Sequence, residues 1–276
     1  MIKFSHSVFA LPFAFTSGIL AGGGIPGARE ILWITVAMVS ARSAAMGLNR
    51  IADRKIDALN PRTQNREIPS GAVKTAEASV FTAVFSALFV VSAYMLNPLC
   101  LKLSPLVLAV LFFYSYTKRF TWSSHLFLGV AISGAPLGAW IAIRGDISIS
   151  IIPLVLAVVF WLAGFDILYA LQDVDFDRRH GLYSIPRRFG VKRAITISRF
   201  FHLLTFVFLA VTGAIFKMGF LYFIGITVVA ALLIYEHSLV KPDDLSKLNM
   251  AFFNINGYIS VTVFVFVLIE NTLFKA

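Results

Sequence analysis

Residues 150–177 read SIIPLVLAVVFWLAGFDILYALQDVDFD, an apolar run that ends in a spaced series of acidic side chains. The apolar part is long enough to cross about 30 Å of hydrocarbon as a helix, so it predicts a membrane span over residues 150–170. Three aspartates and a tyrosine recur at intervals of three or four residues, which places them on one side of a helix. These residues are Asp166, Tyr169, Asp173 and Asp177.

The rest of the chain is also too apolar for a soluble protein. Hydrophobic residues make up 58% of 276 positions, charged residues 14%, and the mean hydropathy is +0.82. We therefore expect an all-α, polytopic membrane protein in which residues 1–276 form one transmembrane domain. The first apolar run follows Lys3, but no small-residue cleavage site leads into a polar region, so we expect this run to be retained. Nine spans are predicted, at residues 5–24, 31–49, 76–96, 99–116, 124–143, 150–170, 194–216, 218–240 and 252–273.

Another acidic cluster lies at the end of the predicted span 31–49. Asn49, Asp53 and Asp57 recur every four residues, so they fall on one helix face. Arg42 precedes Asn49 by seven residues and returns to roughly the same face. The alternative is a solvated, salt-bridged helix end. Arg42 argues against it, since an arginine two turns inside a span is costly unless it faces a cavity or a partner.

The later cluster has a similar alternative, a run of surface charge that follows the helix. This alternative fits residues 175–179 better than Asp166, which begins inside the apolar run. A carboxylate in hydrocarbon indicates a functional site, because it is costly there without a partner. Asp175 breaks the four-residue interval, so we expect it to point elsewhere.

The distribution of Lys and Arg predicts the orientation. If the spans alternate, the N-terminus and the connections around 50–75, 117–123, 171–193 and 241–249 carry 18 of the 24 basic residues, counting Arg199. Because cytoplasmic loops are enriched in Lys and Arg, we expect the N-terminus and both clusters to face the cytoplasm, in the cell inner membrane. These loops account for the net charge of +10, so no nucleic acid partner is expected.

The clusters together supply up to five carboxylates, and the same side of the chain supplies many cations. Mg²⁺ prefers few carboxylates together with phosphate oxygens and water, so the combination predicts a diphosphate bound through Mg²⁺. The metal would neutralise the diphosphate and make it a good leaving group. The cations are Arg62, Arg66, Lys118, Arg119, Arg178, Arg179, Arg187 and Arg188.

The apolar surroundings predict the other half of the substrate. A diphosphate at the edge of a membrane bundle is compatible with a long apolar chain that enters from the lipid, and a polyprenyl diphosphate meets both demands. When the diphosphate leaves the allylic carbon, the polyprenyl group becomes a delocalised cation, which aromatic ring faces stabilise. Most of the 27 phenylalanines must be ordinary packing or lipid contacts. Near the polar rim we single out Tyr114, Tyr116 and Tyr169.

These motifs resemble the UbiA superfamily of integral-membrane prenyltransferases. Residues 49–57, NRIADRKID, and 60–71, NPRTQNREIPSG, are similar to its first signature, and the spacing from Asp166 to Asp177 is similar to its second. Arg50 departs from the acidic residue that usually follows the asparagine. This form resembles a bacterial subgroup of 4-hydroxybenzoate polyprenyltransferases linked to menaquinone made through futalosine.

The resemblance implies a nine-helix bundle around a central cavity, and it implies roles for individual residues. It associates Arg66, Lys118 and Arg119 with the diphosphate or with the carboxylate of the acceptor, and we add Arg42 and Arg62 to this group. It assigns Mg²⁺ and diphosphate to Asn49, Asp53, Asp57, Asp166, Asp173 and Asp177.

We expect Mg²⁺-dependent transfer of a polyprenyl group to 4-hydroxybenzoate or a dihydroxynaphthoate in ubiquinone or menaquinone biosynthesis. Asp166 or Tyr169 would orient or deprotonate the phenol. Haem O synthase and a lipid prenyltransferase remain alternatives within the superfamily. A cation-coupled carrier is disfavoured, because carriers bind near the bilayer midplane and these clusters straddle its boundary. The expected catalytic residues are Asp53, Asp57, Asp166, Asp173 and Tyr169.

Overall fold

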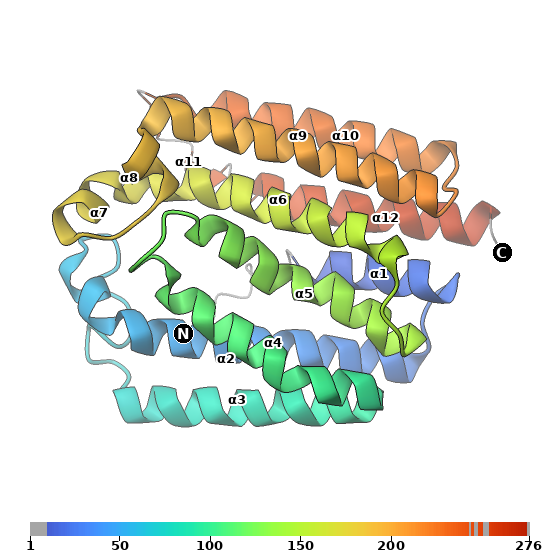
Figure 1. Cartoon of the computed structure of the whole chain (residues 1–276), viewed down its shortest axis with the longest axis horizontal. Helices are drawn as coiled ribbons and strands as arrows, with labels where there is room; N and C mark the ends of the chain where they lie inside the picture. The colour runs from blue at the N-terminus through green and yellow to red at the C-terminus, as the bar shows by residue number, and fades with distance from the viewer. Residues whose placement is uncertain (1–9, 243, 246–247, 251–253, 275–276) are drawn as a thin grey trace.

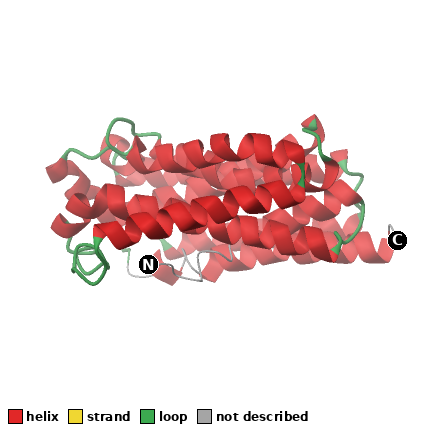
Figure 2. Cartoon of the chain, turned by 90° about the horizontal axis from the view of Figure 1, so that it is seen from below, coloured by secondary structure: helices red, strands yellow, loops and turns green. Residues whose placement is uncertain are grey.

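A computed structural model describes residues 10–242, 244–245, 248–250 and 254–274. Within these ranges the chain is helical, apart from turns and one isolated bridge between Lys241 and Asp244. The long helices run side by side along the longest axis, and their connections gather at the two ends (Figure 1, Figure 2). They are α1 (Leu11–Gly22), α2 (Ala28–Leu59), α3 (Thr75–Leu96), α4 (Pro98–Thr117), α5 (Ser124–Arg144), α6 (Ile152–Ala170), α9 (Val191–Ile215), α10 (Phe220–Leu239) and α12 (Asn256–Phe274).

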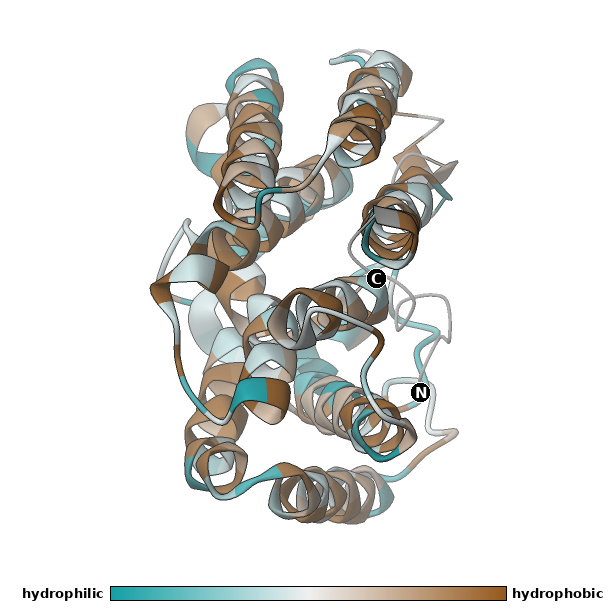
Figure 3. Cartoon of the chain, turned by 90° about the vertical axis from the view of Figure 1, so that its right-hand side faces the viewer, coloured by the Kyte–Doolittle hydropathy of each residue, from teal (hydrophilic) through white to brown (hydrophobic). Residues whose placement is uncertain are grey.

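Eight of the described segments are long and apolar enough to cross a membrane, and α1 is a shorter apolar helix. The prediction of an all-α membrane protein with nine apolar helices is therefore confirmed, although residues 5–9 of the first predicted span lie outside the described part. Seen along the bundle, hydrophobic residues cover outward as well as inward sides of the helices (Figure 3). On α3, for example, Val80 and Val84 are 64% and 57% exposed. Such a surface suits lipid rather than water.

α2 is longer than the predicted span 31–49. Its 32 residues correspond to a length of about 48 Å, more than the roughly 30 Å of hydrocarbon. Between Asn49 and Leu59 no glycine or proline interrupts it, so the first cluster stays helical beyond the predicted span. The helix ends at Asn60, whose extended backbone is the conformation favoured before Pro61.

The later cluster is divided among three successive elements instead of one helix. α6 ends at Ala170, the 3₁₀ turn η3 (Leu171–Asp173) follows, and α7 (Val174–His180) comes next. Gly181 ends α7 with a left-handed φ of 71°. α8 (Ile185–Phe189) then precedes α9. The helical interval predicted that the helix continues to Asp177, so the break at η3 and the short helix α8 were not predicted.

α6 is the most buried of the candidate spans and packs between α5 and α9 (Figure 1). Its Trp161 is fully buried, with its ring centroid 5.0 Å from that of Phe13 in α1. The indole Nε1–H donates to Asn256 Oδ1 in α12 at 2.7 Å. Asp166 lies five residues further along this anchored helix, so the core holds the start of the later cluster in place.

Close packing of α5 against α6 depends on Gly129. A β-carbon at Gly129 would come 2.4 Å from the carbonyl oxygen of Val159, whereas one at Gly134 meets nothing within 4 Å. Gly129→Ala is expected to destabilise the protein by about 1–3 kcal/mol, because the helices must move apart. Gly134→Ala should be neutral or stabilising through helix propensity. Thermal unfolding midpoints of both variants in detergent test this, and equal midpoints would contradict the close contact.

Candidate active site

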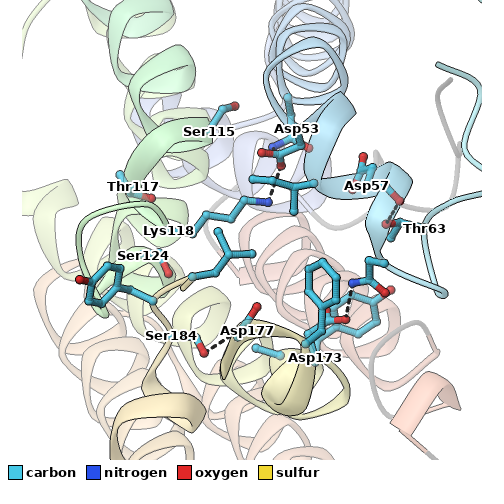
Figure 4. Close-up of a pocket in the computed structure, with 18 of the residues that line it drawn as sticks. Asp53, Asp57, Thr63, Ser115, Thr117, Lys118, Ser124, Asp173, Asp177 and Ser184 are labelled. Atoms are coloured by element: carbon cyan, nitrogen blue, oxygen red, sulfur yellow. Dashed lines mark hydrogen bonds and ion pairs between the residues drawn. The ribbon is translucent and has the colours of Figure 1, made fainter. Parts of the chain in front are cut away.

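Side chains from both acidic clusters line one cavity at the end of the bundle that carries α7 and α8 (Figure 4). Its volume is about 200 Å³. α2 and the loop after it form one wall, η3 and α7 form another, and the adjoining ends of α4 and α5 complete it. The lining includes these residues singled out from the sequence: Asn49, Asp53, Asp57, Arg62, Arg66, Tyr114, Lys118, Asp166, Tyr169, Asp173 and Asp177.

Seven other residues singled out from the sequence do not belong to this lining: Arg42, Tyr116, Arg119, Arg178, Arg179, Arg187 and Arg188. Arg119 stacks on the half-exposed ring of Tyr116, 4.9 Å from its centroid, and contacts Asp53 with a guanidinium nitrogen. Arg42 shares a helical face with Asn49, but seven residues of helix place it about 10 Å deeper along α2. The buried Arg42 Nε has no hydrogen-bond partner among the described residues.

Asp53 is buried at the wall formed by α2 and is held by cations from the end of α4. Lys118 Nζ lies 2.5 Å from Asp53 Oδ2, and Arg119 Nη2 lies 3.3 Å from Oδ1. Asn49 donates its Nδ2–H to Oδ2 at 3.2 Å, as expected for residues four apart on a helix. Lys118 directly follows α4, so the turn after that helix delivers the ammonium group to the cavity.

Asp57 is paired with the loop that follows its own helix. Arg66 Nη1 lies 2.7 and 2.9 Å from the two carboxylate oxygens, and Thr63 donates its hydroxyl to the Asp57 carbonyl oxygen at 3.1 Å. Arg50 Nη1 is 4.0 Å from Asp57 Oδ2. Arg50, the residue that departs from the family pattern, therefore adds a second positive charge beside this carboxylate.

Asp173 joins the wall formed by η3 to the loop after α2. Arg62 Nε and Nη2 donate to its two oxygens at 3.0 and 2.5 Å, and Asn60 Nδ2 donates at 3.0 Å. Arg62 also donates to the Tyr169 hydroxyl at 3.0 Å and lies over that ring. Burial opposes the charge of Arg62, but its hydrogen bond to Asp173 and the charge of that carboxylate raise the pKa of the guanidinium. Segments more than 100 residues apart are thus joined by a bidentate ion pair.

The other two carboxylates have partners that are neither Lys nor Arg. Asp166 Oδ2 lies 2.7 Å from His125 Nδ1, and Asp177 Oδ2 accepts a hydrogen bond from the Ser184 hydroxyl at 2.8 Å. Sequence reasoning missed His125 and Ser184. His125 is 41 residues from Asp166 in the chain, and Ser184 lies beyond Gly181, where α7 ends, so no helical interval indicated either contact. Asp175 points away from the cavity, as expected, with its side chain 80% exposed.

The donor set of the cavity is compatible with a metal that arrives together with a diphosphate. Within the described residues, no three His, Cys, Asp or Glu side chains gather into a group that could hold a metal by themselves. Mg²⁺ needs only one or two carboxylates when phosphate oxygens and water complete its shell. The carboxylates of facing walls offer such oxygens, and the neighbouring Lys and Arg side chains offer donors for phosphate.

Known proteins resemble this chain in sequence and in fold. The sequence profile of the UbiA prenyltransferase family matches residues 10–258. The 4-hydroxybenzoate octaprenyltransferase of Vibrio campbellii is 30% identical over 251 residues, which cover 91% of this chain and 88% of that protein.

Solved structures extend the likeness to three dimensions. The apo structure of a UbiA homolog from Aeropyrum pernix gives a TM-score of 0.89 at 32% identity, covering 98% of this chain and 99% of the other. A UbiA homolog from Archaeoglobus fulgidus, bound to GPP and Mg²⁺, gives a TM-score of 0.68 at 20% identity, covering 96% and 97%. At that identity the second likeness concerns the fold alone.

Proposed function

The chain belongs to the UbiA prenyltransferase family, and from this premise we propose that it transfers a polyprenyl group from polyprenyl diphosphate to 4-hydroxybenzoate. One observation carries the proposal: aspartates from both clusters line one cavity at the end of an apolar bundle, together with three cations that pair with them, Lys118, Arg62 and Arg66. A polar diphosphate suits the cavity, and an apolar chain suits the helices and lipid beside it. The acceptor is taken from the name of the Vibrio campbellii relative.

We assign the diphosphate and the metal to the walls formed by α2, η3, α7 and the loop after α2. Bound there, Mg²⁺ would offset the charge of the diphosphate and stabilise it as it leaves. Lys118, Arg66 and Arg62 lie within reach of the same space and would donate hydrogen bonds to phosphate oxygens. The residues proposed to hold the metal are Asn49, Asp53, Asp57, Asp173 and Asp177.

The acceptor would meet the allylic carbon on the side of the cavity that holds Asp166. The rings of Tyr114 and Tyr169 line the cavity and would stabilise positive charge as the diphosphate departs. Arg42 and Arg119 are the proposed candidates to pair with the acceptor's carboxylate. The buried Arg42 Nε has no hydrogen-bond partner among the described residues, whereas Arg119 already contacts Asp53. The membrane orientation proposed from the basic loops opens the cavity to the cytoplasm, where the product would enter respiratory quinone synthesis.

Product analysis with matched acceptors tests this function. The purified protein in lipid nanodiscs, with Mg²⁺ and a polyprenyl diphosphate, is incubated separately with 4-hydroxybenzoate, a dihydroxynaphthoate, haem b or a glycerophosphate lipid precursor. We expect mass spectrometry to find prenylated 4-hydroxybenzoate as the main product, with one diphosphate released per product. Prenylation of only haem or the glycerophosphate would overturn the proposal. Prenylation of only the dihydroxynaphthoate would retain the aromatic reaction and change the acceptor.

A further inference from the structure

His125 connects three elements around the cavity. It lies in the first turn of α5, and its side chain is 4% exposed. Its Nδ1 is 2.7 Å from Asp166 Oδ2 in α6. Its Nε2 accepts a hydrogen bond from the backbone N–H of Ile185, the first residue of α8, at 3.4 Å.

The contact with Ile185 determines which nitrogen of His125 carries the proton. A backbone N–H donates only to a nitrogen with a free lone pair, so Nε2 is unprotonated. The proton of the neutral imidazole is therefore on Nδ1, and the N–H donates to Asp166. The imidazole fixes one oxygen of Asp166, and the other oxygen takes no part in this bond.

This arrangement separates Asp166 from three of the four carboxylates proposed to hold the metal, since Asp177 also has a neutral partner, the Ser184 hydroxyl. Asp53, Asp57 and Asp173 are each paired with Lys or Arg, whereas the partner of Asp166 is a neutral donor. A neutral donor orients a carboxylate without cancelling its charge. The Asp166 side chain is also 21% exposed, while His125 behind it is buried. Asp166 is thus an oriented oxygen acceptor that a ligand can reach.

We propose that His125 is a positioning residue that aims Asp166 at the hydroxyl group of the aromatic acceptor. This rests on the proposed function. The phenolic proton passes to Asp166 while the ring carbon beside the hydroxyl bonds to the allylic carbon, whose bond to oxygen breaks with both electrons leaving on diphosphate. The ring carbon then loses its proton to a diphosphate oxygen, and Asp166 returns its proton to the phenol oxygen.

Two substitutions at His125 test the proposal. His125→Phe fills the space but removes the donor, and it is expected to lower kcat by about 10- to 100-fold. His125→Asn keeps an amide nitrogen close to the position of Nδ1, and we expect it to restore kcat to within about threefold of wild type. Binding of an unreactive polyprenyl thiodiphosphate with Mg²⁺ should be unchanged in both variants. The deficit of His125→Phe should shrink with 3-fluoro-4-hydroxybenzoate, whose hydroxyl loses its proton more readily.

A double-variant comparison separates positioning from packing. In an Asp166→Asn background, His125→Phe should lower kcat little further, because both substitutions act through the same carboxylate. Equal losses in His125→Phe and His125→Asn, additive effects with Asp166→Asn, or weaker thiodiphosphate binding would each overturn the positioning role. These results leave the proposed function intact if wild type still prenylates 4-hydroxybenzoate. A wild-type protein that prenylates no phenolic acid would remove both proposals.

Discussion

Asp53→Asn and Asp173→Asn are each expected to lower kcat/KM for prenyl transfer by about 10³-fold, a loss of roughly 4 kcal/mol in transition-state stabilisation. Asparagine keeps the size of the side chain but removes the charge proposed to hold Mg²⁺. It also leaves Lys118 or Arg62 without its ion-pair partner. The measurement is the initial rate of product formation in nanodiscs over a range of polyprenyl diphosphate concentrations.

Asp175→Asn is the matched control for these variants. Asp175 lies two residues from Asp173, but its side chain is 80% exposed and its contact with Arg178, at 3.9 Å, is on the surface. We expect its activity to stay within about twofold of wild type, since exposed ion pairs contribute little. Unfolding midpoints of all three variants show whether the fold is retained. Turnover near wild type in folded Asp53→Asn and Asp173→Asn would mean that the site assignment is wrong.

Removal of divalent metal is expected to abolish turnover and to weaken binding of a polyprenyl thiodiphosphate by about 10- to 100-fold. Five aspartates line the cavity, and three of them are neutralised by Lys118, Arg66 and Arg62. Without metal, the diphosphate must compete with these carboxylates for the same cations. The binding measurement, by isothermal calorimetry with and without chelator, reports on the site independently of chemistry.

Restoration by Mg²⁺ is the control for metal removal. Adding back Mg²⁺ should recover both binding and turnover, whereas NaCl at the same ionic strength should not. Asp53→Asn measured with Mg²⁺ should bind the thiodiphosphate about as weakly as the chelated wild type. Turnover that persists in chelator would assign charge neutralisation to the Lys and Arg side chains alone and would contradict the magnesium site.

The sequence predicted helices and shared helix faces correctly, because both depend on residues that are close together in the chain. The apolar runs predicted the helices, because the length needed to cross hydrocarbon can be read from consecutive residues. The four-residue interval placed Asn49, Asp53 and Asp57 on one face of α2, which faces the cavity. The same interval put Arg42 on this face, but Arg42 does not line the cavity. Seven residues of helix separate it from Asn49 along the axis of α2.

Ends of helices were predicted less well than their middles. α2 continues to Leu59 because charged residues with good helix propensity do not end a helix, and Pro61 does. The later cluster looked like a continuous helical series, but η3 interrupts it after Ala170. Asp173 and Asp177 nevertheless line the cavity, because the tighter turn only redirects the chain before α7 begins.

The sequence by itself determined that this is a helical membrane protein with two acidic clusters and cations on one side, because composition, periodicity and charge are properties of neighbouring residues. Only the tertiary structure decided which partner each carboxylate has. Lys118 and Asp53 are 65 residues apart, Arg62 and Asp173 are 111 apart, and His125 and Asp166 are 41 apart. Such pairs form where packed helices bring distant segments to the same end of the bundle, and no spacing along the chain encodes that packing.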